Sequence, residues 1–138
     1  MDEIIVGVDE SDTARVAAKE AALLAQQLGR PLHLVTALKR AKGESVKAGA
    51  ERVVIDPLTL AEDFLRSLKG SLPGGIEATH AAVVAEPADA LCQEAERLGA
   101  SIIVVGNKRV QSAARVLGSI PLDVAKHAPC NVYIVHTT

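Results

Sequence analysis

Residues 101–138 read SIIVVGNKRVQSAARVLGSIPLDVAKHAPCNVYIVHTT, and they contain two apolar runs separated by a short helical stretch. The runs, Ile102–Val105 and Val132–Val135, are continuous rather than alternating, which is typical of strands buried on both faces of a parallel sheet. We expect the helix to span about residues 120–127, because Ala128 and Pro129 follow it. This unit of strand, helix and strand predicts a parallel sheet covered by helices.

The same rhythm extends backward through the rest of the chain. Three further apolar runs precede this unit: Ile4–Val8, Leu32–Thr36 and Ala81–Val84. Helical stretches that end close to a glycine separate these runs: Thr13–Leu28, Leu58–Leu68 and Pro87–Leu98. Strands that alternate with helices predict a doubly wound, three-layer α/β sandwich of Rossmann-like type with right-handed crossovers. A length of 138 residues suits one such domain, spanning residues 1–138.

Residues 39–57, KRAKGESVKAGAERVVIDP, interrupt this rhythm. The segment is long and polar, contains glycine, and has no steady period. Connections of this length inside a compact domain are commonly functional flaps or mobile loops. Two interpretations follow, a solvated loop and a lid over a ligand, and we favour the solvated loop because charged runs usually face solvent.

The composition excludes several classes of protein. Hydrophobic residues make up 49% and charged residues 23% of the chain, which is ordinary for a packed globular domain. Base-stacking platforms need exposed aromatic rings, yet the chain has one Phe, one Tyr and no Trp, and its net charge is −2. We expect no nucleic-acid partner, since there is no basic field to replace phosphate counterions.

The sequence also carries no pattern of a membrane or secreted protein. No apolar run approaches the roughly 20 residues of a membrane span, and the acidic N-terminal stretch does not resemble a signal peptide. Cys92 and Cys130 have no metal-binding spacing. We therefore expect a cytoplasmic protein with two reduced thiols and no membrane partner.

A candidate anion site follows the fourth apolar run. Gly106 ends the run, a segment with Lys108 and Arg109 but no acid follows, and the last helix begins near Gly118 and Ser119. Glycines allow backbone N–H groups to approach a phosphate closely, and a helix N-terminus carries roughly half a positive charge. Ser119 has two compatible roles here, as a phosphate ligand and as the helix N-cap.

A second candidate group follows the first two apolar runs. In an open parallel sheet, ligands bind beyond the carboxyl ends of the strands, at the crevice where the strand order reverses. Asp9 follows the first run, where its carboxylate suits a ribose hydroxyl or an adenine amino group; the alternative is a role in the turn alone. Val8, Thr36 and Ala37 would provide small walls for a flat base.

Other catalytic and binding motifs do not occur in the sequence. Neither GxxxxGK(S/T) nor GxGxxG is found, which excludes the P-loop and the dinucleotide fingerprint. There is no GxSxG nucleophile elbow, and the four histidines are scattered without helical pairing. His33 lies in an apolar run, and we expect a satisfied core or edge histidine rather than a ligand.

The chain resembles the universal stress protein family over nearly its whole length. Four stretches carry the resemblance: IIVGVDES at 4–11, LHLVTA at 32–37, EPADAL at 86–91 and the whole of 101–138. The resemblance implies five parallel strands in order 3-2-1-4-5, which places the reversal between the first and fourth strands, beside Asp9 and Gly106. It also implies a homodimer through the last strand, whose residues here are Val132, Tyr133, Ile134 and Val135.

The resemblance further implies an adenine nucleotide as ligand. Members that bind ATP carry a glycine, two residues, a second glycine, nine residues, and then Gly-Ser or Gly-Thr. By this resemblance the candidate binding residues are Val8, Asp9, Thr36, Ala37, Val105, Gly106, Lys108, Arg109, Gly118, Ser119 and Ile120. ATP is the first expectation, with Mg²⁺ as its companion ion, and AMP and cyclic AMP are the alternatives.

The sequence departs from that family pattern in three places. Arg109 replaces the second glycine, Glu10 stands where glycine is common, and Ala85 stands where a glycine often precedes the proline. Arg109 either contacts phosphate through its guanidinium or fills the pocket. The alternative function is therefore a dimeric interaction protein whose pocket is closed by Arg109 and Glu10. Because no water-activating base is evident beside the phosphate loop, we expect at most a weak ATPase.

Overall fold

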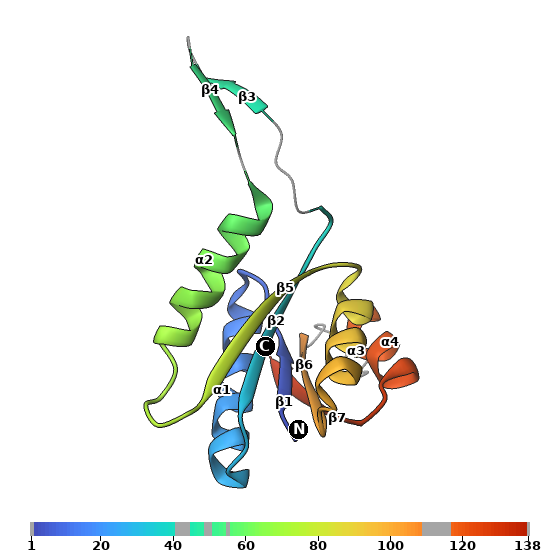
Figure 1. The fold of residues 1–138 in the computed structure, drawn as a ribbon. Coiled ribbons are helices and arrows are strands. Elements are labelled where there is room, and N and C mark those ends of the chain that lie inside the picture. Colours follow the sequence, from blue (N-terminus) through green and yellow to red (C-terminus); the bar gives the residue numbers. More distant parts are fainter. Residues whose placement is uncertain (1, 41–44, 49–50, 55, 109–116, 138) are drawn as a thin grey trace.

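The structure, a computed structural model, describes residues 2–40, 45–48, 51–54, 56–108 and 117–137. Its central sheet contains the parallel strands β1 (Ile4–Gly7), β2 (Leu32–Leu38), β5 (Ala78–Val84), β6 (Ile102–Lys108) and β7 (Asn131–Thr137). They lie in the order β5-β2-β1-β6-β7, which confirms the expected order 3-2-1-4-5 (Figure 1). The order reverses at β1, because the chain first builds outward to β5 and later places β6 on the other side of β1.

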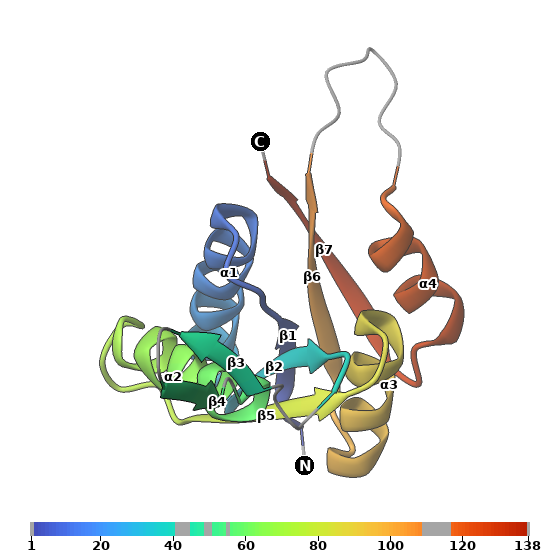
Figure 2. The ribbon, with the colours of Figure 1, turned by 90° about the horizontal axis from the view of Figure 1, so that it is seen from above.

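Helices cover both faces of this sheet. Their bounds are α1 (Asp12–Leu28), α2 (Pro57–Gly70), α3 (Pro87–Leu98) and α4 (Ser119–His127). Helices α1 and α2 lie on one face and α3 and α4 on the other (Figure 2). The three layers confirm the doubly wound α/β sandwich. Among the described residues, none of the helices combines the length and the apolar character needed to cross a membrane.

Both faces of the central strands are buried, as the continuous apolar runs predicted. Ile4 and Val6 belong to the core cluster on the α1 side, whereas Ile5 belongs to the cluster on the α3 side, and all three are fully buried. Helix α1 meets the sheet through a row of alanines: Ala14, Ala17, Ala18, Ala21, Ala22 and Ala25. These small side chains allow α1 to pack closely on β1 and β6.

Side-chain and glycine caps set the ends of the helices. Ser11 Oγ accepts a hydrogen bond from Ala14 N at 3.1 Å where α1 begins, and Gly29, at φ 64°, closes that helix in the left-handed conformation. Pro87 begins α3, and Gly99, at φ 63°, closes it. The helices agree with the predicted stretches to within one or two residues.

Strand β6 is longer than its apolar run predicted. It continues to Lys108 rather than ending at Val105, because its ladder with β7 pairs Asn107 with His136 and Lys108 with Thr137. Hydrophobicity marks the buried part of a strand, whereas the backbone ladder continues through polar residues. The candidate residues at 106 and 108 therefore lie on the strand itself rather than in a loop after it.

Part of segment 39–57 forms a hairpin that the sequence did not predict. Strands β3 (Ser45–Ala48) and β4 (Glu51–Val54) pair in antiparallel fashion. Figure 1 shows this hairpin extending away from the five-stranded sheet, between the end of β2 and the start of α2. Strands of four residues are too short for an alternating pattern to stand out from the sequence.

Candidate functional site

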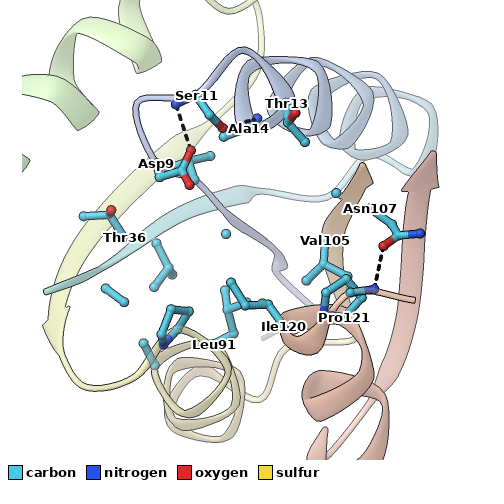
Figure 3. A pocket seen from close by; sticks show the side chains of 18 of the residues that line it. Asp9, Ser11, Thr13, Ala14, Thr36, Leu91, Val105, Asn107, Ile120 and Pro121 are labelled. Atoms are coloured by element: carbon cyan, nitrogen blue, oxygen red, sulfur yellow. Dashed lines mark hydrogen bonds between the residues drawn. The ribbon is translucent and has the colours of Figure 1, made fainter. Parts of the chain in front are cut away.

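A cavity of about 480 Å³ opens at the carboxyl ends of β1, β2 and β6. This is the position where the strand order reverses, and its volume is in the range of small-molecule sites. The first turns of three helices, α1, α3 and α4, also line it. Figure 3 shows side chains from all of these elements around the cavity.

Every candidate binding residue that the structure describes lines this cavity. These residues are Val8, Asp9, Thr36, Ala37, Val105, Gly106, Lys108, Gly118, Ser119 and Ile120. Arg109, the remaining candidate, lies outside the described residues. The sequence interpretation missed Gly7, Ser11, Thr13, Ala14, Val35, Pro87, Ala90, Leu91, Asn107 and Pro121. Most of the missed residues begin helices at the same edge of the sheet, a position that the fold prediction alone could have identified.

Asp9 takes the turn role that the sequence allowed. Its Oδ1 accepts a hydrogen bond from Ser11 N at 2.8 Å, which fixes the turn between β1 and α1 (Figure 3). The side chain is nevertheless exposed and lines the cavity. One residue thus shapes the turn and also presents a carboxylate at the edge of the cavity.

Gly106 has a packing role in addition to its place at the cavity. A Cβ atom there would lie 3.3 Å from Thr13 Cγ2 and 3.4 Å from Ala17 Cβ, both on α1. The first contact is tight enough that the Thr13 side chain would have to shift by a few tenths of an ångström, whereas the second is close to an ordinary packing distance. The close packing of α1 on β6 therefore accounts for a glycine at this position before any ligand is considered.

The expectation that Ser119 is the N-cap of the last helix is wrong. Gly118 is the N-cap of α4, and Ser119 is the first helical residue. Asn107 Oδ1 accepts a hydrogen bond from Gly118 N at 2.9 Å, so a side chain of β6 contacts the start of α4. Ser119 therefore does not cap the helix, and it lines the cavity.

Backbone strain does not explain why residue 118 is a glycine. Its φ of −65° is open to any residue, and a Cβ atom would make only ordinary contacts, 3.5 Å from Asn107 Oδ1 and 3.6 Å from Pro121 Cδ. The absence of a side chain instead keeps the backbone at the start of α4 accessible from the cavity.

The electrostatics of the cavity favour an anion. The N-termini of α1, α3 and α4 converge on it, and each carries a partial positive charge. Lys108 adds a full positive charge, while Asp9 places a negative one at the turn after β1. Within the described residues, no group of three or more His, Cys, Asp or Glu side chains could hold a metal ion.

The inner walls of the cavity are apolar. Val8, Val35, Leu91 and Val105 are all buried and line it. A Cβ atom on Gly7 would lie 3.0 Å from Leu91 Cδ1, so the glycine makes room for that leucine. A flat apolar ring suits these walls.

A separate polar cluster around the buried His33 and Glu94 joins α3 to β2 and β5. His33 Nδ1 lies 2.6 Å from Thr79 Oγ1 and its Nε2 lies 3.0 Å from Glu94 Oε1, which confirms a satisfied core histidine. Arg97 holds the same carboxylate with two hydrogen bonds of 2.7 and 2.8 Å. The Arg97 guanidinium, aided by His33 and opposed by burial, lowers the pKa of Glu94 to about 2. This cluster fixes α3, which forms one wall of the cavity.

Comparison with known proteins agrees with this architecture. The family model of the universal stress protein family matches residues 1–136. Two universal stress proteins of Mycobacterium tuberculosis are each 30% identical to this chain, covering 98% of it and 96% of the relative.

Solved structures of related proteins match over nearly the whole chain. A universal stress protein crystallised in complex with cAMP is 29% identical, with a TM-score of 0.71, covering 99% of this chain and 98% of its own. A universal stress protein from Archaeoglobus fulgidus is 26% identical, with a TM-score of 0.63 and coverage of 97% and 93%. UspA from Lactobacillus plantarum, at 24% identity, 97% coverage of both chains and a TM-score of 0.68, shares the fold. The chain belongs to the universal stress protein family.

Proposed function

We propose that the protein is a stress-response homodimer that binds an adenine nucleotide in the cavity between β1 and β6. The observation that carries this proposal is the convergence of three helix N-termini and apolar walls on one cavity of suitable volume. The related structure in complex with cAMP supports the adenine nucleotide as the ligand class.

The apolar walls and the helix N-termini suggest how the ligand is oriented. The adenine ring lies between the apolar walls, beside Val8, Thr36, Ala37 and Val105. Asp9 receives a ribose hydroxyl or the adenine amino group, because its carboxylate is an acceptor at the end of β1.

The phosphate lies at the start of α4 and at the cationic end of β6. Ser119 and Ile120 supply N–H groups and Ser119 a hydroxyl, while Gly118 leaves room for the ligand. Lys108 supplies charge, and Gly106 keeps the adjoining wall free of a side chain.

ATP remains the first ligand to test, with AMP and cyclic AMP as alternatives that share the adenosine group. Lys108 at the end of β6 and Arg109, the next residue in the sequence, suit a triphosphate, which Mg²⁺ would accompany. We propose binding rather than turnover, because Asp9 is the only carboxylate among the described lining residues and one of its oxygens already accepts from Ser11. A weak ATPase activity is the most that this arrangement supports.

The alternative function, an interaction protein with a closed pocket, requires Arg109 and Glu10 to fill the cavity. Glu10 is exposed and is not one of the described residues that line the cavity. This position of Glu10 favours the nucleotide over the closed pocket.

We place the dimer interface on β7, one of the two edge strands of the sheet. An unpaired edge strand exposes backbone groups that a second copy can pair. Val132 and Ile134 are partly exposed and Tyr133 is 43% exposed, so the edge also carries apolar surface. Val135 is buried in the core cluster on the α1 side of the same chain.

We place this function in the cytoplasm, where a reducing environment suits two free thiols. Cys92 and Cys130 are both free cysteines, and burial raises the pKa of each thiol. Raised pKa values disfavour the reactive thiolate.

Calorimetric titration with ATP, AMP and cyclic AMP, each with and without Mg²⁺, tests the nucleotide proposal. Micromolar binding of at least one of them is the expected result. The protein concentration should be about 100 times a micromolar dissociation constant. An absence of heat with all three nucleotides at that concentration would overturn the proposal and favour a protein partner.

A further inference from the structure

We propose that Asn107 is a positioning residue that holds the start of α4 in the geometry needed to bind the phosphate group of the nucleotide. The inference rests on the proposed function. Its structural basis is the hydrogen bond from Gly118 N to Asn107 Oδ1, at 2.9 Å, which joins a strand to a helix across eleven positions of sequence.

Asn107 is an unusual choice for its position. It lies within β6, is only 5% exposed, and pairs in register with His136 of β7. Asparagine is depleted in strands, and a buried amide is costly unless it is hydrogen-bonded. A residue that departs from local preference in this way indicates a role beyond packing.

The hydrogen bond determines which N–H groups of α4 face the ligand. Gly118 N is used by Asn107, and Leu122 N donates to Gly118 O at 3.1 Å, where the helical ladder starts. Pro121 has no N–H group. Ser119 and Ile120 therefore carry the N–H groups that have no acceptor within the helix, and both residues line the cavity.

Asn107 can orient these two groups because it is itself held firmly. Val105, two residues earlier on β6, forms part of the apolar wall, so the strand that carries the base wall also carries Asn107. Figure 3 shows Asn107 beside Val105, with its hydrogen bond reaching the start of α4 near Pro121. Loss of the bond would free the phosphate end of the site while the base end remains intact.

The test compares ligands with and without phosphate. Asn107→Ala should weaken AMP binding by about tenfold, the order expected for one hydrogen bond that orders a charged contact, and change adenosine binding by less than about twofold. Asn131→Ala, the same substitution at an exposed position at the opposite end of neighbouring β7, is the matched control and should change neither affinity.

A resonance of the Gly118 amide provides an independent readout. In Asn107→Ala its proton signal should move upfield and its hydrogen exchange should accelerate, whereas Asn107→Asp retains an acceptor and should preserve both. The aspartate variant is used for this spectrum only, since its charge would repel a phosphate. If Asn107→Ala does not fold, Asn107→Ser replaces it in both the binding measurement and the spectrum. The serine hydroxyl is too short to reach Gly118 N.

The outcomes separate the two proposals. If the unmodified protein binds none of ATP, AMP and cyclic AMP, the proposed function fails and this inference fails with it. If the unmodified protein binds AMP and adenosine, two results overturn the inference alone: equal loss of AMP and adenosine affinity in Asn107→Ala, which marks a purely structural role, or unchanged AMP affinity.

Discussion

Gly106 and Thr13 stand so close that a Cβ atom on the glycine would lie 3.3 Å from the threonine Cγ2. The contact joins the carboxyl half of β6 to the first turn of α1, and both elements line the cavity. A glycine that the sequence pattern assigned to a phosphate loop therefore also contributes to the packing of the first crossover.

Gly106→Ala should lower the free energy of unfolding by about 1 kcal/mol, because the added methyl group overpacks the contact with α1. Thr13→Ser removes Cγ2 and should recover part of that loss when the two changes are combined. Urea unfolding of the two single variants and the double variant measures this coupling. Strictly additive effects would show that the two side chains do not compete for space.

Gly118→Val should abolish binding of phosphate-containing nucleotides and leave the fold intact. The φ of −65° suits valine, and the new Cβ atom would make only ordinary contacts, so the loss arises from blocked access to the backbone. Calorimetry measures the affinity and thermal unfolding checks the fold. Gly74→Val is a matched control in open space and should change neither quantity; retained nucleotide affinity in Gly118→Val would exclude this end of the cavity as the phosphate site.

Arg109→Gly should weaken ATP binding several-fold if the guanidinium contacts phosphate, since a charge-assisted contact is lost. AMP, which has fewer phosphates, should be affected less. Titration of both nucleotides measures the difference. Stronger binding of ATP to the variant would instead identify Arg109 as a plug.

Tyr133→Asp should convert the proposed homodimer to a monomer, because it places a charge at the centre of the proposed β7 interface. Sedimentation equilibrium measures the mass. Val84→Asp introduces the same charge on β5, the opposite edge strand, where Val84 is 52% exposed, and should leave the dimer unchanged. A monomeric mass for the unmodified protein would refute the interface.

Glu94 should contribute to stability in a pH-dependent way. Its pKa is about 2 in the folded protein, against an ordinary value of 4.5. A depressed folded pKa stabilises the protein above pH 4.5, and this contribution is lost as the pH falls from 4.5 to about 2. The shift corresponds to roughly 3 kcal/mol at most.

Urea unfolding of the unmodified protein and Glu94→Gln at several pH values measures that contribution. The stability difference between them should be about 2 kcal/mol near neutral pH and shrink as the pH falls through this window. Glu96→Gln, an exposed position on the same helix, should show no such difference. A difference that is constant with pH would mean that the Glu94 charge is not what stabilises α3.

The fold could be predicted well because a strand that is buried on both faces consists almost entirely of apolar residues. Ile4, Ile5 and Val6 alternate between the two faces, yet all are apolar, as helices on both sides require. Strands β3 and β4 leave no comparable mark, since their sequences SVKA and ERVV mix charged and apolar residues over four positions each.

The site could be predicted in position but only partly in detail. Asp9 and Ser119 could be named because turn and helix-start chemistry is local in sequence. The bond from Gly118 to Asn107 could not be predicted, because it depends on how far β6 extends and where α4 begins. The capping role expected for Ser119 was wrong for the same reason.

The position of β1 in the middle of the sheet also has a consequence for how the chain folds during synthesis. Ile4 pairs with Leu32 on one side, but on the other side it pairs with Ile102, which emerges from the ribosome only after most of the chain. Such a non-local pairing carries a large loop-closure cost and comes late. The cavity between β1 and β6 can thus form only when the two halves of the domain join. A bound ligand would therefore stabilise the completely folded chain over every partly synthesised one.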